Sequence, residues 1–114
     1  MYLTTQILSN QGALGFHAGS SRAAALLCYL SNRQGRGPST WVNRDTICKA
    51  LGWNPYRLKQ FDEAVQELVD RQLIVIEDKL IPNTKTVTTH YDCRPTLGVL
   101  KRLGALESKE ESQS

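Results

Sequence analysis

The sequence has little of what marks a secreted or membrane protein. Its longest apolar run, residues 23–30, is far shorter than the roughly 20 residues that cross a bilayer. The N-terminus shows no charged segment followed by an apolar run, which is the pattern of a signal peptide. The three cysteines, Cys28, Cys48 and Cys93, have no paired spacing, which indicates reduced, buried thiols and not a disulfide framework. We therefore expect a cytoplasmic protein that makes no membrane contact.

The residues from which most catalytic and metal sites are built are also scarce. The chain has two histidines, His17 and His90, and it offers no Ser–His–Asp arrangement, phosphate-binding loop or paired carboxylates. His90 and Cys93 have the spacing of a metal-binding pair, but residues three apart on a strand point to opposite faces of the sheet. The sequence therefore predicts no enzyme activity, no metal site and no cofactor.

The net charge of +3 is small, but it is unevenly distributed along the chain. Residues 1–61 carry seven lysines and arginines against one acid, whereas residues 62–78 carry six acids against one arginine. Residues 79–102 are basic again, with five basic residues against one acid. If the fold brings the two basic segments together, they form one positive face with the acids turned away. Such a face favours nucleic acid as the partner.

The first part of the chain predicts an arm followed by a buried helix. Residues 1–19 are uncharged and include several glycines, which indicates an N-terminal arm that either forms a short strand or packs on another element, followed by a loop. Ser20 or Ser21 can cap the next helix, residues 22–33. Apolar residues recur along it at the 3.6-residue period, with small apolar residues between them. A helix that is apolar on most sides is expected to be the central one.

Two further helices are predicted on either side of a tight turn. Asn43 can cap the first, residues 44–51, and Gly52 supplies the left-handed residue that ends it. The Asn54–Pro55 pair then provides an N-cap and a first helical residue for a helix over residues 55–72. The positions predicted to face inward on this helix are Leu58, Phe61, Val65, Leu68 and Val69.

The remaining sequence predicts strands. Residues 40–42 are long enough for a bridging strand only, and residues 73–78 form a β-branched run that is typical of a strand. Residues 79–85 contain Pro and Asn and are expected to be a loop. Residues 86–93 alternate, which predicts a hairpin strand with one solvated face and one packed face. The packed face is expected to hold Val87, Thr89, Tyr91 and Cys93.

A last amphipathic helix is predicted over residues 95–108, followed by a disordered tail over residues 109–114. Leucines recur along this helix with a spacing of three, and two glycines weaken it. An apolar stripe on a terminal helix is a candidate contact for a homodimer. The residues of this stripe are Leu97, Leu100, Leu103 and Leu106.

The order helix, short strand, helix, tight turn, helix, strand, loop, strand resembles the winged helix-turn-helix DNA-binding domains of bacterial, phage and plasmid regulators. The resemblance rests on residues 44–73 and extends over about residues 20–93. Gly52 occupies the turn, and Cys48 stands where the family has a small residue. The resemblance implies an α+β, mainly α fold, with a three-helix core and a β-hairpin wing in a domain over residues 20–94. The residues at the family's buried positions are Ile47, Leu51, Trp53, Leu58 and Phe61.

The resemblance also implies sequence-specific binding of double-stranded DNA, with the third helix in the major groove. Helical periodicity turns Tyr56, Lys59 and Gln60 away from the apolar face, and we expect them to read bases. The acids later in this helix would meet phosphates, so only its N-terminal half is expected to enter the groove. Expected contacts with the DNA backbone are Asn54, Arg57, Arg44, Lys49, Arg33 and Arg36, and those of the wing are Lys79, Asn83 and Lys85.

Three alternatives remain beside the main hypothesis, which is a small prokaryotic or mobile-element transcriptional regulator located at the nucleoid. A plasmid or phage replication-initiation protein would use the same DNA-binding surface. A winged-helix adaptor would bind a protein partner instead, through the uncharged arm and the leucine stripe. Finally, the polar residues of the third helix are also what the solvated face of any amphipathic helix would carry.

Overall fold

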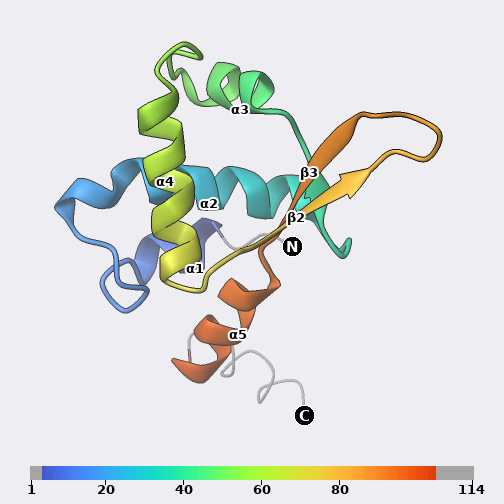
Figure 1. Cartoon of the computed structure of the whole chain (residues 1–114). Helices are drawn as coiled ribbons and strands as arrows, with labels where there is room; N and C mark the ends of the chain where they lie inside the picture. Colours follow the sequence, from blue (N-terminus) through green and yellow to red (C-terminus); the bar gives the residue numbers. More distant parts are fainter. Residues whose placement is uncertain (1–3, 105–114) are drawn as a thin grey trace.

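The computed structural model describes residues 4–104, which form an α+β fold with one antiparallel sheet (Figure 1). About half of the chain is helical, so the predicted fold class is confirmed at this level. Among the described residues, no helix is long and apolar enough to cross a membrane. The elements in chain order are α1 (Thr4–Ser9), the short 3-10 helix η1 (Ala18–Ser20), α2 (Ser21–Gln34), β1 (Thr40–Trp41), α3 (Arg44–Leu51), α4 (Leu58–Asp70), β2 (Val75–Leu80), β3 (Val87–Asp92) and α5 (Arg94–Arg102).

Helix α2 lies at the centre of the core, as its sequence predicts. Its Leu26, Leu27 and Leu30 are fully buried, and α1, α3 and α4 all pack against it. Figure 1 shows α2 passing behind α4, with α3 above it and α1 below it. Ser20 occupies the N-cap position, but its hydroxyl accepts the backbone N–H of His17 (3.1 Å) and caps no N–H of α2.

The N-terminal segment is helical from Thr4, so the prediction of a short strand there is wrong. Ile7 of α1 is fully buried, and Leu14 and Phe16 of the following turn belong to the same core. A six-residue helix has little stability of its own. Docking of Ile7 against α2 therefore stabilises α1, and the segment packs on another element, which is the second of the two expectations.

Helix α3 has the predicted bounds and the predicted ends. The Asn43 side chain accepts the N–H of Thr46 (2.8 Å) and satisfies one free donor of the first turn. Gly52 has a φ of 73°, the left-handed conformation that ends the helix. Trp53 follows at once, and its N–H donates to the Cys48 carbonyl (2.8 Å).

Helix α4 is shorter than predicted at both ends. The prediction of a start at Pro55 is wrong because the Asn54 side chain accepts the N–H of Tyr56 (2.9 Å) and the Asn54 carbonyl accepts the N–H of Arg57 (3.1 Å). These bonds form a separate turn ahead of the helix. At the other end, Gln72 adopts a φ of 57°, and the chain leaves the helix there.

The buried face of α4 also differs from the predicted one. Phe61 and Leu68 are buried as expected, together with Ala64, and Val65 is half-buried. Leu58 is 42% exposed and Val69 lies on the exposed side, so the two predicted end positions do not face the core. The apolar stripe of α4 is therefore narrower than the periodicity suggests.

The sheet has the strand order β1–β3–β2, with Thr40 paired to Tyr91 and Ile76 paired to Tyr91 on the other side. Strand β2 begins and ends two residues later than predicted, so Lys79 lies in the strand and not in the loop. The hairpin turn has the features of a type II turn: Thr84 donates to the Ile81 carbonyl (3.1 Å), and Asn83 has a φ of 66°.

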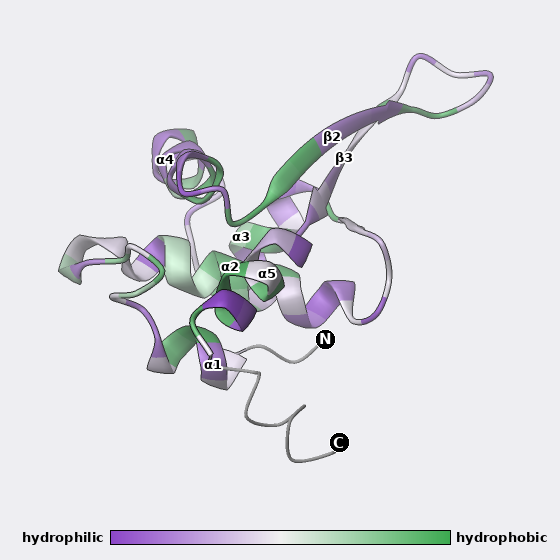
Figure 2. Cartoon of the chain, turned by 90° about the horizontal axis from the view of Figure 1, so that it is seen from below, coloured by the Kyte–Doolittle hydropathy of each residue, from purple (hydrophilic) through white to green (hydrophobic). Residues whose placement is uncertain are grey.

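The predicted alternation of β3 holds only at the base of the hairpin. Tyr91 and Cys93 are buried as expected, but Val87 is 57% exposed and Thr88, assigned to the solvated face, is buried. The Thr88 hydroxyl donates to the Lys79 carbonyl across the ladder (3.2 Å). Figure 2 shows that the outer half of the hairpin projects beyond the helices, which accounts for the exposure of Val87.

Helix α5 ends at Arg102, earlier than predicted, and the leucine row is divided. Leu100 is fully buried in the core of its own chain and is not available to a second copy, Leu97 is half-buried, and Leu103 is exposed. The Thr96 hydroxyl donates to the Leu73 carbonyl (2.7 Å) and fixes α5 to the connection between α4 and β2. Leu106, most of the predicted segment after residue 102, and the tail lie outside the described residues.

The cysteines are free, as predicted. Cys48 and Cys93 are buried, and Cys28 is half-buried. Burial raises the pKa of Cys93 to about 12, with the nearby Asp92 adding to the rise and the Ser31 hydroxyl opposing it. Its thiol therefore stays protonated at neutral pH.

Candidate nucleic-acid interface

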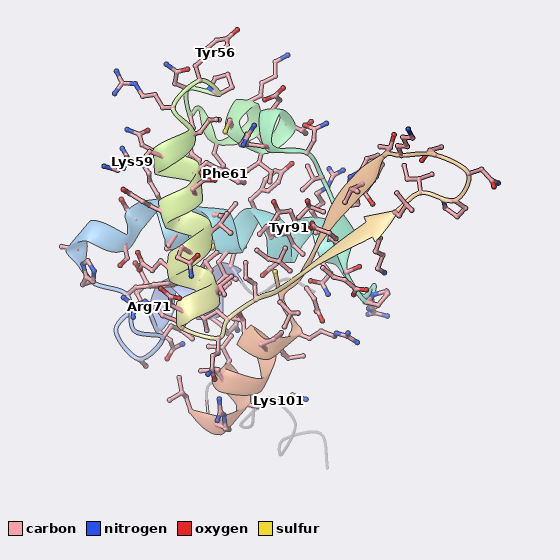
Figure 3. The ribbon with its side chains drawn as sticks, in the orientation of Figure 1. Tyr56, Lys59, Phe61, Arg71, Tyr91 and Lys101 are labelled. Atoms are coloured by element: carbon pink, nitrogen blue, oxygen red, sulfur yellow. The ribbon has the colours of Figure 1, made fainter. Side chains whose placement is uncertain are left out.

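The end of the molecule formed by α3, the following turn and the first turn of α4 carries the most exposed aromatic side chain of residues 4–104. We call residues 44–60 the α3–α4 corner. Tyr56 projects from its turn with 92% of its surface exposed, beyond the N-terminal end of α4 (Figure 3). The two hydrogen bonds to Asn54 hold the backbone of this turn, so the tyrosine stands on an ordered support.

A groove with a volume of about 860 Å³ runs between α3 and the start of α4. The apolar part of its lining includes Trp53, Pro55 and Leu58. Arg44 and Lys49 of α3 also line it, and they are exposed. The complete lining is Arg44, Asp45, Cys48, Lys49, Gly52, Trp53, Pro55, Tyr56 and Leu58.

The corner is strongly cationic, and the acids of α4 follow it. Residues 44–60 contain four basic residues and one acid. Lys59 lies 3.8 Å from Glu63, but both side chains are largely exposed, and such a pair contributes little in water. The positive charge is therefore concentrated at the N-terminal end of α4, as the sequence predicts. The four cations are Arg44, Lys49, Arg57 and Lys59.

Gln60 is not on the same side as Tyr56. It is half-buried and lines a recess of about 70 Å³ together with Arg22 of α2 and Glu63 and Glu67 of α4. Its side chain thus lies beside the start of α2, with two carboxylates around it. The structure separates Gln60 from the two other residues that the sequence assigned to base contacts.

The hairpin residues are also divided. Asn83 and Lys85 lie in or next to the exposed turn at the tip. Lys79 lies on β2 and lines a recess of about 180 Å³ with Glu77, His90, Asp92 and Arg94 among others. Lys79 therefore has two carboxylates beside it, whereas Asn83 and Lys85 do not line this recess.

Arg33 and Arg36 are not brought to the corner. Arg33 donates to the Trp41 carbonyl (3.3 Å) at the base of the sheet. Arg36 lies in the connection between α2 and β1, which runs below the hairpin in Figure 1, on the side away from α3. Of the six residues assigned to the DNA backbone, Asn54, Arg57, Arg44 and Lys49 therefore share one surface.

A second groove of about 350 Å³ connects the corner with the hairpin. Arg44 and Phe61 line one side of it and Val87 and Tyr91 the other. Burial raises the pKa of Tyr91, Arg44 lowers it, and Asp78 and Asp62 raise it further. The tyrosine therefore remains neutral, and Arg44 belongs to both grooves.

Sequence reasoning missed the groove residues. Pro55 was assigned to helix initiation, Leu58 to the core, and Trp53 to a buried position of the turn. The composition of residues 53–58 could have indicated the groove. This turn contains Trp, Pro, Tyr and Leu beside Arg57, which is a high apolar content for an exposed corner.

The described residues hold no group of three or more His, Cys, Asp or Glu that could bind a metal ion. Cys48 forms part of the first groove, but burial raises its pKa, which Asp45 also raises and Arg44 lowers. Its thiol is therefore neutral at pH 7.

No protein-family model matches the chain, and no curated protein or solved structure shows significant similarity to it. The residues and geometry of the corner and the hairpin therefore carry the functional proposal.

Proposed function

We propose that the chain binds double-stranded DNA through the α3–α4 corner, in the manner of a winged helix. The observation that carries the proposal is the cationic corner, on which Tyr56, Arg57 and Lys59 project at the N-terminal end of α4. A helix end of this kind fits the major groove, which is about 12 Å wide. Lysines and arginines around it neutralise phosphates and supply most of the affinity.

The hairpin supports the same proposal by its position. Figure 2 shows α4 and the β2–β3 hairpin on one side of the molecule, with α1, α2 and α5 on the other side. Lys85 near the tip would contact the DNA backbone beside the groove that α4 enters. Because Lys79, Arg33 and Arg36 lie elsewhere, we assign them no DNA contact, and Gln60 a weaker one than Tyr56 and Lys59.

A transcriptional regulator is the biological role that we propose, and a replication-initiation protein would use the same surface. We also propose a homodimer, in which Leu103 and the partly exposed Leu97 contact the second copy. A protein–protein adaptor is the second candidate, favoured by the exposed Leu80 and Val87 on the hairpin.

Fluorescence anisotropy with a random 30-base-pair duplex tests the proposal. Wild-type binding should weaken steeply as salt rises, and Arg57→Ala should weaken it on every sequence and flatten the log–log salt slope by about one unit. Arg102→Ala, a matched loss of an exposed arginine on α5, should change neither quantity.

Two outcomes would contradict DNA binding through the α3–α4 corner. The first is no association with the duplex even at low salt. A pull-down would then test the second candidate function, a protein–protein adaptor, with the hairpin variant Leu80→Asp as the control. The second is an equal loss of affinity in Arg57→Ala and Arg102→Ala, which would mean that charge alone, and not the corner, attracts DNA.

A further inference from the structure

The groove between α3 and α4 has the size and the lining of a ligand site. Its volume of about 860 Å³ lies within the range of about 300–1,000 Å³ that is usual for such sites. Trp53, Pro55 and Leu58 give it an apolar wall, and Leu58 stays 42% exposed although it stands in an apolar position of α4. A duplex contacted only at its phosphates would leave this apolar surface in water.

Tyr56 lies at the same groove and adds an aromatic ring. The ring is almost entirely exposed, while the bond from its N–H to Asn54 fixes the backbone that carries it. An aromatic ring on an ordered turn loses little conformational freedom when a flat partner stacks on it. The groove thus offers one exposed and one half-buried aromatic residue, Tyr56 and Trp53.

The positive charge of the groove indicates which planar ligand it would bind. Arg44 and Lys49 line it against one acid, Asp45, and Arg57 and Lys59 are exposed beside it. The ligand should therefore combine an aromatic face with negative charge, which is the chemistry of a nucleotide. Aromatic side chains in a positive groove are the usual means of holding unpaired bases.

We propose that this groove binds an unpaired base of single-stranded DNA, stacked on Tyr56, with its phosphates on Arg44 and Lys49. The proposal rests on the proposed DNA binding and extends it, because bases inside a duplex cover each other's faces and cannot stack on a side chain. The chain would then hold a melted or unpaired stretch at or beside its duplex site.

The test compares fluorescein-labelled (dT)15 with a 15-base-pair duplex by anisotropy, using the full chain. Tyr56→Ala should weaken binding of (dT)15 by roughly 5- to 150-fold. It should weaken binding of the duplex, which has a random sequence, by much less, because such a duplex offers no specific base for Tyr56 to read. Tyr56→Phe should retain single-strand affinity, because stacking needs the ring and not the hydroxyl. The salt slope of Tyr56→Ala should equal that of the wild type, because no charge is lost.

Leu8→Ala is the control, since it removes an exposed apolar side chain of α1 that does not line this groove. It should leave (dT)15 affinity unchanged, and thermal unfolding verifies that each variant is folded. In a Trp41→Phe background, Trp53 is the remaining tryptophan, and its emission should be quenched by (dT)15 and not by the duplex.

Several outcomes would overturn the proposal. Duplex binding without (dT)15 binding would remove it and leave the proposed function standing, whereas binding of neither would remove both. Equal effects of Tyr56→Ala on the two DNAs would mean that Tyr56 contacts both in the same way and does not stack on an unpaired base. A Tyr56→Phe variant as weak as Tyr56→Ala would mean that the hydroxyl forms a hydrogen bond and the ring does not stack.

Discussion

The part of the molecule around α2 and the part formed by the α3–α4 corner and the hairpin use apolar residues in opposite ways. Leu26, Leu27 and Leu30 of α2 are completely buried, whereas Tyr56, Leu80 and Val87 expose more than half of their surface. The helices around α2 make most of the core, whereas the corner and the hairpin leave several large apolar side chains in water. Stability and recognition are therefore expected to depend on different residues of the same small chain.

The largest predicted effect tests this separation directly. Leu27→Ala should lower the free energy of unfolding by about 2–5 kcal/mol, because it leaves a cavity in the closely packed centre of the core. Leu80→Ala, the same change on the hairpin, should lower it by less than about 0.5 kcal/mol. Urea denaturation measures both. Similar losses of stability in the two variants would show that the hairpin is as tightly packed as α2, and stability would then not be confined to the core.

A smaller effect is expected at the junction of the two parts, where Asn43 caps α3. Asn43→Ala should lower the free energy of unfolding by about 1 kcal/mol, because the N–H of Thr46 loses its acceptor. Asn43→Asp keeps an acceptor at this position and should be close to the wild type. Thermal or urea unfolding of the wild type and the two variants measures these stabilities. If Asn43→Asp lost as much stability as Asn43→Ala, the loss of the side-chain cap would not be its cause.

The smallest predicted effect is a pH dependence at the base of the sheet. Burial raises the pKa of Asp92, but hydrogen bonds from Arg94 and Gln34 and the charge of Arg94 outweigh it and hold the pKa below its ordinary value of 3.8. The carboxylate is thus favoured by the folded state. Its contribution to stability is present above about pH 4 and is lost as the pH falls through the lowered pKa.

Asp92→Asn should therefore show a smaller fall in melting temperature between pH 5 and pH 3 than the wild type does. Asp45→Asn on the exposed surface of α3 is the matched control and should retain the wild-type fall. The assignment to Asp92 would be lost if both variants responded to acid alike.

Local sequence signals predicted the elements that carry their own start and stop residues. Helix α3 has its predicted bounds because Asn43 caps it and Gly52 ends it, and both act within a few residues. The bounds of α2 were close because its leucine period is unbroken. The cationic corner was also predictable, since Arg57 and Lys59 are near in sequence and precede the acids of α4.

The wrong predictions concern segments whose sequence pattern is compatible with two different structures. The Asn54–Pro55 pair is suitable for a helix start or for a separate turn, and the hydrogen bond to Tyr56 selects the turn. Helix α1 has weak helical signals and depends on the burial of Ile7 against α2. The alternating sequence of β3 predicts a packed and a solvated face, but it does not predict at which residue the hairpin extends beyond the core.

The sequence by itself determined the α+β class, the order of the central helices and hairpin, and the clustering of positive charge before negative charge. These follow from periodicity, capping residues and chain order, which are local properties. Only the tertiary structure decided that Gln60 lies beside α2, that Lys79, Arg33 and Arg36 leave the corner, and that Leu58 and Trp53 line a groove. Each of these depends on which elements pack together, and a linear pattern carries no information on a contact between segments far apart in the chain.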